Sequence, residues 1–273
     1  GRNEKILPAQ YRSIPREAYT GKAYPDLLLR SMYQPYGEVD ITMDMDALLR
    51  SATPLALKVI VPFWLSCAPY FNSDIKVQKA ALTHIKNYCN AAIKYPRLIP
   101  KGLFDACAEH FTLHLWRLSY CGGNMSEEIS AYGHFLQFFM KHFYPRWNQV
   151  KRKNGKRRKK IRIGYISSNF CNQAVSFYMV NRILHADKDK FEVVTFSLER
   201  RRDEMTERIV EKSDEYIAIT ELQDLDVIAQ TIVDADVDML IYTDIGMDPQ
   251  TYKLAAMQLA PVQAVLVGHG VTT

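Results

Sequence analysis

The hydrophobic pattern of the chain changes at Ile161, and this change largely determines the fold that the chain can adopt. After it, short runs of apolar and β-branched residues alternate with amphipathic stretches. Such alternation predicts the strands of a parallel sheet that is covered by helices on both faces. The expected strands are 161–168, 191–198, 215–220, 237–244 and 262–268, and the expected helices are about 174–184, 203–212, 225–233 and 249–259. This part is predicted to be a Rossmann-like, doubly wound lobe.

Before the change, apolar residues recur at the three-four spacing of buried helix faces. Ser126 follows a Gly-Gly pair and is expected to cap the last helix. The fold class is therefore α/β, with an N-terminal all-α domain followed by a Rossmann-like doubly wound parallel-sheet lobe. We predict a helical domain with an irregular N-terminal arm over 1–147, a basic linker over 148–160, and the lobe over 161–273. The expected helices are 44–51, 54–71, 75–95, 101–120 and 126–147.

Composition places the chain among ordinary globular proteins, with 48% hydrophobic and 24% charged residues. No apolar run approaches the roughly 18–20 residues that span a bilayer, and the N-terminus has no apolar leader. The odd number of cysteines fits a reducing compartment better than a disulfide framework. We therefore expect no membrane span, a cytoplasmic location and free thiols at Cys67, Cys89, Cys107, Cys121 and Cys171.

The excess of positive over negative charge comes from one segment. Without nine cations of that segment, the net charge of +5 becomes −4. The segment is interpreted as a solvated linker, because it lacks the aromatic side chains that stack on nucleic-acid bases. Binding to nucleic acid is ranked below this interpretation. The cations are Lys151, Arg152, Lys153, Lys156, Arg157, Arg158, Lys159, Lys160 and Arg162.

Two patterns bear on cofactors and metals. The loop after the first expected strand has no G-x-G-x-x-G, which disfavours NAD or FAD, so no cofactor is expected. Cys107, His110 and His114 share one helical face and could hold a metal. We favour a place in an aromatic-rich core, because no fourth ligand is evident, and we expect no metal site.

Candidate binding residues follow the fourth and fifth expected strands, where ligands of doubly wound sheets bind. Asp244, which is followed two residues later by Gly246, could contact a substrate hydroxyl or could cap the next helix. Gly268 and His269 begin a loop that could hold a phosphate or a sugar, or could be an ordinary turn.

Four segments together resemble the first catalytic lobe of the O-GlcNAc transferase family, which includes bacterial relatives and is similar to the adhesin N-glucosyltransferases. The resemblance covers 161–273, and the helical part matches only in position and class. The segments are IRIGYISSNFCNQAVSFYM, DKDKFEVVTFSL, DVDMLIYTDIGM and LAPVQAVLVGHGVTT.

The resemblance implies a GT-B glycosyltransferase that moves a sugar from a UDP-sugar to Ser/Thr, or Asn, of a polypeptide. UDP-sugar would be a co-substrate, and no metal or nucleic acid is implied. His269 and Gln173 take the catalytic positions. The implied substrate-binding residues are Asn172, Asp244, Gly246, Gly268, Thr272 and Thr273.

The sequence also departs from the family pattern. Gln173 stands where the family has a histidine, and Gln cannot act as a general base. Ala174 and Gly270 replace prolines. Because the chain ends at Thr273, we expect the second lobe to be missing and binding of UDP-sugar to be weak without that lobe or a partner transferase. The alternative is a non-catalytic scaffold that holds a polypeptide. The sequence does not specify the sugar, the acceptor, the linkage or the oligomeric state.

Overall fold

The computed structural model describes residues 44–66, 75–120, 123–149, 158–198, 201–219 and 224–266. The chain divides into two compact units, Gly1–Phe139 and Met140–Thr273. The domain boundaries predicted from the sequence, at 147 and 160, stay a prediction. Within the described ranges, no helix combines the length and the apolar character needed to cross a membrane.

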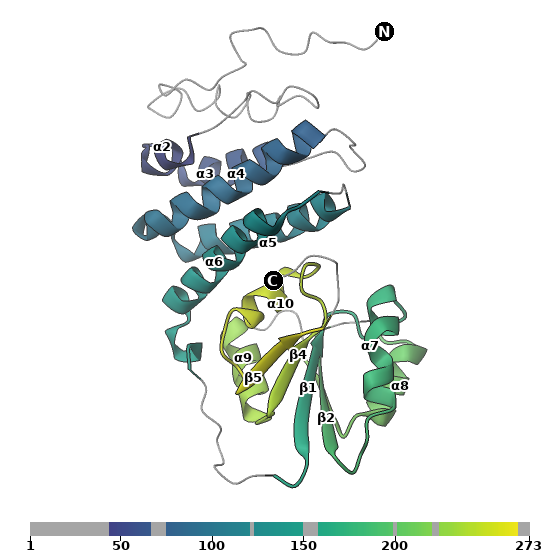
Figure 1. The fold of residues 1–273 in the computed structure, drawn as a ribbon. Coiled ribbons are helices and arrows are strands. Elements are labelled where there is room, and N and C mark those ends of the chain that lie inside the picture. The colour runs from purple at the N-terminus through teal and green to yellow at the C-terminus, as the bar shows by residue number, and fades with distance from the viewer. Residues whose placement is uncertain are drawn as a thin grey trace, which may run out of the picture. The chain divides into compact units, whose positions relative to one another are not determined.

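The first unit is helical (Figure 1). Its packed interior is strongly aromatic, and Phe135 contacts the rings of Tyr88, Phe104, Tyr132 and Phe139. All five side chains are fully buried, so these rings form the centre of the unit. The elements are α2 (Met45–Arg50), α3 (Leu55–Ser66), α4 (Ile75–Lys94), η4 (Pro96–Leu98), α5 (Lys101–Ser119) and α6 (Ser126–Phe143), whose last residues belong to the second unit.

Two details of α6 differ from the sequence prediction. The helix was expected to continue to Trp147, but it ends at Phe143 and a short 3₁₀ helix, η5 (Pro145–Trp147), follows. Pro145 explains the break, because proline has no N–H and disfavours helical geometry in the residue before it. The prediction that Ser126 is the cap was wrong. Ser126 is the first helical residue, and its N–H donates to Asn124 Oδ1 at 3.0 Å.

The second unit contains a five-stranded parallel sheet of order β3-β2-β1-β4-β5. The strands are β1 (Ile161–Ser167), β2 (Phe191–Ser197), β3 (Glu215–Ala218), β4 (Met239–Tyr242) and β5 (Val262–Val265), and the helices are α7 (Ala174–Leu184), α8 (Glu204–Lys212), α9 (Leu225–Asp234) and α10 (Pro249–Ala255). Figure 1 shows α7 and α8 on one face of the sheet and α9 and α10 on the other. The predicted fold class, a helical region followed by a doubly wound parallel sheet, is confirmed.

The centre of the sheet is closely packed around Gly164 in β1. A methyl group on Gly164 would lie 2.9 Å from Phe196 Cε2 on β2 and 3.1 Å from Leu240 Cδ1 on β4. Both neighbours are fully buried. The glycine therefore allows the side chains of β2 and β4 to meet over β1.

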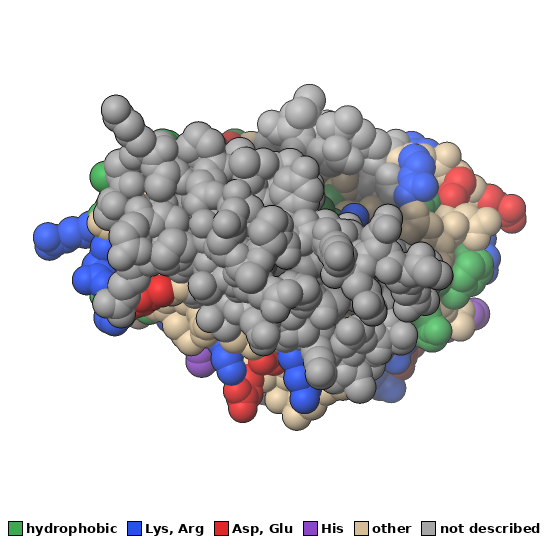
Figure 2. Space-filling view, turned by 90° about the horizontal axis from the view of Figure 1, so that it is seen from above, with side chains coloured by type: hydrophobic (Ala, Val, Ile, Leu, Met, Phe, Trp, Pro, Cys, Tyr) green, Lys and Arg blue, Asp and Glu red, His purple; other side chains and the backbone are tan. Residues whose placement is uncertain are grey.

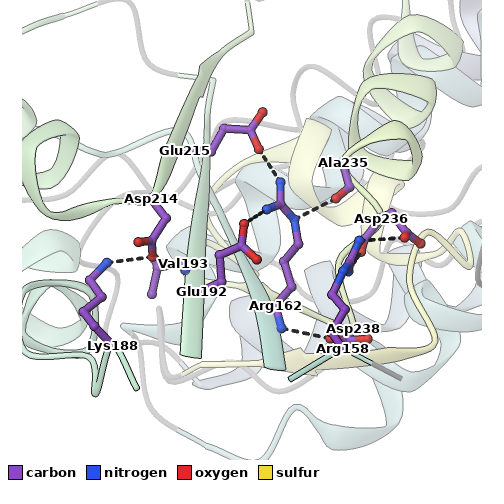
Figure 3. A network of polar contacts seen from close by, with 10 residues as sticks. All are labelled: Arg158, Arg162, Lys188, Glu192, Val193, Asp214, Glu215, Ala235, Asp236 and Asp238. Atoms are coloured by element: carbon purple, nitrogen blue, oxygen red, sulfur yellow. Dashed lines mark hydrogen bonds and ion pairs between the residues drawn. The ribbon is translucent and has the colours of Figure 1, made fainter. Parts of the chain in front are cut away.

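The amino ends of the strands are joined by Arg162, as Figure 3 shows. Its guanidinium forms ion pairs with Glu192 of β2 and Glu215 of β3, and its Nε donates to Ala235 O at 2.9 Å. The backbone N–H of Arg162 donates to Asp238 Oδ2 at 2.9 Å. These contacts stabilise the end of the sheet where the strands begin, opposite their carboxyl ends.

Candidate functional site

The order of the strands defines where a ligand of this sheet would bind. The chain builds outward from β1 through β2 to β3, and then returns to form β4 on the other side of β1. β1 and β4 are hydrogen-bonded neighbours. In doubly wound sheets the ligand crevice lies beyond the carboxyl ends of the two strands at such a switch point. The relevant segments here are the loop 168–173 after β1 and Asp244 after β4.

Asp244 is fully buried and its carboxylate organises the loop after β1. Ser167 Oγ donates to both carboxylate oxygens at 2.9 Å, and Thr243 Oγ1 donates to Oδ1 at 2.7 Å. Ser168 donates to Oδ2 through its backbone N–H and through Oγ, the latter at 2.8 Å, and Asn169 Nδ2 donates at 3.1 Å. Both oxygens are therefore engaged by the chain itself.

The same loop is held from α7 and α8. Asp203, the N-cap of α8, accepts a hydrogen bond from the Asn172 N–H at 2.7 Å. This bond is the main cause that lowers the pKa of Asp203 below its usual value. Thr206 Oγ1 donates to Phe170 O at 2.7 Å, and Ser176 Oγ donates to Asn169 O. The loop is thus fixed from several directions and is preorganised.

Gln173 is the N-cap residue of α7, but its side chain does not bond to the helix. One orientation of the side-chain amide allows both its nitrogen and its oxygen to form hydrogen bonds. In that orientation Nε2 donates to Asn169 Oδ1 at 2.8 Å and Oε1 accepts from the guanidinium of Arg201. Gln173 is partly exposed and Asn172 is exposed. Solvent or a ligand can therefore reach both residues.

The turn after β4 explains Gly246. It has a φ of 93°, which favours glycine, within a turn where the Met247 N–H donates to Asp244 O at 3.0 Å. The turn leads to Asp248, which caps α10 by accepting from the Thr251 N–H at 2.7 Å. Burial, with a contribution from the nearby charge of Asp244, raises the pKa of Asp248 to about 6.

The structure brings together three of the residues that the sequence singled out. Asn172, Gln173 and Asp244 lie at one edge of the sheet, and Asp244 reaches Gln173 through Asn169. Asn169, Arg201 and Asp203, which also take part in these contacts, were not among the site residues predicted from the sequence. The other predicted residues, Gly268, His269, Thr272 and Thr273, lie outside the described residues.

The helical face with Cys107, His110 and His114 packs into the core of the first unit. Cys107 Sγ lies 3.2 Å from the hydroxyl of Tyr88, and the ring of Phe63 contacts both histidines, with centroids 4.6 and 4.9 Å away. Burial lowers the pKa of His114 to about 4. Among the described residues, no group of three or more potential ligands could hold a metal ion.

Part of the basic segment has acidic partners. Arg158 forms an ion pair with Asp236 at 2.7 Å, and Arg162 is bound by two glutamates at the edge drawn in Figure 3. Figure 2 shows basic and acidic side chains side by side on the described surface of the face in view. Residues 151–157 lie outside the described residues, so the interpretation of the segment as a linker stays a prediction.

Comparisons with known proteins relate the second unit to a known family by its sequence. Residues 138–273 match the sequence model of glycosyl transferase family 41. No curated protein matches the chain. Among solved structures, a mutant of the O-GlcNAc transferase of Thermobaculum terrenum aligns with 94% of this chain and 52% of its own, with 16% identity and a TM-score of 0.48. The chain thus spans about half the length of that structure. Residues 138–273, which hold the whole parallel sheet, therefore belong to glycosyl transferase family 41.

Proposed function

We propose that the chain is the acceptor-side part of a protein glycosyltransferase, which moves a sugar from a UDP-sugar to a Ser/Thr hydroxyl or an Asn amide of a polypeptide. The observation that carries the proposal is the family 41 match over the parallel sheet. The ordered polar loop at the switch point of that sheet supports it, because sugar transfer needs fixed hydrogen-bonding groups around the reacting atoms.

Each candidate residue has a role in this proposal. Asn172 and Gln173 hydrogen-bond the sugar or the acceptor from the loop after β1. His269 orients the acceptor hydroxyl or accepts its proton as that oxygen forms the new bond to the sugar and UDP leaves. In this proposal the donor sugar is bound by His269 together with Gly268, Thr272 and Thr273. Asp244 and Gly246 act on the substrate through the loop and the turn that they hold.

The proposal also includes a cellular setting and partners. A second α/β lobe, from the same protein or from a partner transferase, would supply most of the UDP contacts.

UDP-sugar is a co-substrate, and no resident cofactor or metal is invoked. The described cysteines are buried thiols, which suits the reducing cytoplasm that we propose as the location.

The test is a transfer assay on the complete protein with UDP-GlcNAc and UDP-glucose, with Ser/Thr- and Asn-containing peptides, read by mass spectrometry. We expect addition of one sugar to a peptide. His269→Ala should reduce turnover by at least about tenfold, and more than Gln173→Ala, because an imidazole can exchange a proton near neutral pH and an amide cannot. Full activity of His269→Ala would overturn its assigned role.

A second candidate function is a non-catalytic scaffold that holds a polypeptide. It is favoured by Gln173, which cannot take a proton at the position that the family pattern gives to histidine. Calorimetry would support the scaffold if the protein bound peptides but not UDP. Together with the absence of sugar transfer in the assay, this result would contradict the transferase.

A further inference from the structure

A continuous set of hydrogen bonds runs from the loop after β2 to the carboxylate after β4. The Arg201 guanidinium donates to Gln173 Oε1, with its Nη1 at 3.3 Å, and Gln173 Nε2 donates to Asn169 Oδ1 at 2.8 Å. Asn169 Nδ2 then donates to Asp244 Oδ2 at 3.1 Å. The series begins at an exposed cation and ends at a buried anion.

The two ends of this series determine the orientation of both amides. A guanidinium can only donate hydrogen bonds, and an ionised carboxylate can only accept them. If the Gln173 amide turned over, its NH₂ would face the donors of Arg201 and its oxygen would face Asn169 Oδ1. Both hydrogen bonds would be lost, so only one orientation satisfies the series.

We propose that Arg201 is a positioning residue that fixes the Gln173 amide as a hydrogen-bond donor toward the substrate. The proposal rests on the proposed function for the role of Gln173. Oε1 is occupied by Arg201, and one of the two N–H groups is used by Asn169. Gln173 therefore offers one N–H to a ligand, and the substrate atom that it recognises is a hydrogen-bond acceptor, such as a sugar or hydroxyl oxygen.

The loop after β2 supports this role through a second contact. Asp203, two residues beyond Arg201, accepts from the N–H of Asn172, the residue before Gln173. The loop after β2 thus holds the loop after β1 in two ways, because the Asp203 carboxylate binds its backbone and the Arg201 guanidinium binds the Gln173 side chain.

The adjacent arginine provides a matched control. Arg202 is also exposed, but its Nε donates to Glu207 Oε1 of α8 at 3.0 Å. Its removal changes the charge of the same loop by the same amount. Its hydrogen bond and ion pair are with Glu207 and not with Gln173, so Arg202 separates a general charge effect from the specific contact.

The first measurement is the order of the Gln173 side-chain amide by ¹⁵N relaxation in the 273-residue chain, with the signal assigned by its loss in Gln173→Ala. We expect an order parameter above about 0.6 in the wild type and in Arg202→Met, and a lower value in Arg201→Met. Arg201→Lys, which keeps one donor nitrogen in place of the two that Arg201 presents, should restore part of the order. An amide that is equally mobile in the wild type and in Arg201→Met, with unchanged thermal stability, would overturn the proposal.

The second measurement is sugar transfer by the complete protein. Arg201→Met should lower kcat/KM about tenfold, the size expected from one well-placed hydrogen bond, while Arg202→Met keeps the wild-type value. Gln173→Glu keeps a partner for Arg201 but removes the donor, so it should lose activity although Arg201 still binds it. Full activity of Gln173→Glu would contradict the donor role.

The two measurements separate this inference from the proposed function. If the wild type transfers no sugar, the proposed function fails, while the relaxation data still decide whether Arg201 orders Gln173. If the amide is ordered by Arg201 and transfer is present but independent of Arg201, the positioning role is refuted and the transferase stands.

Discussion

Ser167 Oγ lies 2.9 Å from each carboxylate oxygen of Asp244, and this contact joins the ends of β1 and β4. The two residues are far apart in the sequence but adjacent at the switch point of the sheet. Because Asp244 also binds Ser168 and Asn169, it couples the end of β4 to the loop that carries Gln173. A change at Asp244 should therefore affect both the stability of the unit and the proposed site.

Asp244→Asn is expected to destabilise the α/β unit by about 2–4 kcal/mol, because hydrogen bonds to a charged acceptor contribute about 1.5–3 kcal/mol each and an amide nitrogen would face donors. Denaturant unfolding followed by circular dichroism measures the loss. The control is Asp187→Asn, whose exposed partner is Lys190 at 2.7 Å and whose replacement should change stability little. Equal effects of the two replacements would contradict the role assigned to Asp244.

Much of this arrangement could be predicted from the sequence. Alternating periods predicted the strands, and the bounds of α7 agree at both ends, because Gln173 and His185 flank one amphipathic segment. The meeting of Asn172, Gln173 and Asp244 at one edge follows from the geometry of parallel strands. The contact of Arg201 with Gln173 could not be predicted, since it depends on how two loops approach each other in space and no local pattern distinguishes Arg201 from Arg202.

Asp248→Asn is expected to make the α/β unit more stable than the wild type at pH 7. The folded pKa of Asp248, about 6, is above the ordinary value of 3.8, so the folded state loses stability as pH rises from about 4 to 6. Asparagine caps a helix as well as aspartate does but carries no charge. The expected gain is about 1–2 kcal/mol above pH 6, and it should disappear below pH 4.

Unfolding free energies measured between pH 4 and 8 test this expectation. Asp203→Asn is the control of opposite sign, because the pKa of Asp203 is lowered and its charge stabilises the folded state at neutral pH. A loss of stability in both variants at pH 7 would refute the assignment for Asp248.

The helical unit is expected to lose stability on acidification through His114. The folded pKa is about 4, lowered by burial and by the neighbouring Arg117 and His110, so the unfolded state binds the proton first. Stability should therefore fall as pH drops from 6.5 to 4, by up to about 3 kcal/mol. His114→Phe, which removes the titration and a buried Nε2 without a hydrogen-bond partner, should flatten this dependence. The exposed His142 serves as the control, and an equally flat profile in His142→Phe would contradict the assignment.

Two glycine replacements should have opposite effects on stability. Gly164→Ala would place a methyl group 2.9 Å from Phe196, 3.1 Å from Leu240 and 3.2 Å from Val237, so the core must shift, at a cost of about 1–3 kcal/mol. Gly133 lies within α6 and has no atom within 4 Å of the added methyl. Gly133→Ala should therefore stabilise the chain by about 0.5–1 kcal/mol, the difference in helix propensity. Thermal unfolding measures the stability of both variants. Unchanged stability of Gly164→Ala would show that β1 does not pack as closely against β2 and β4 as described.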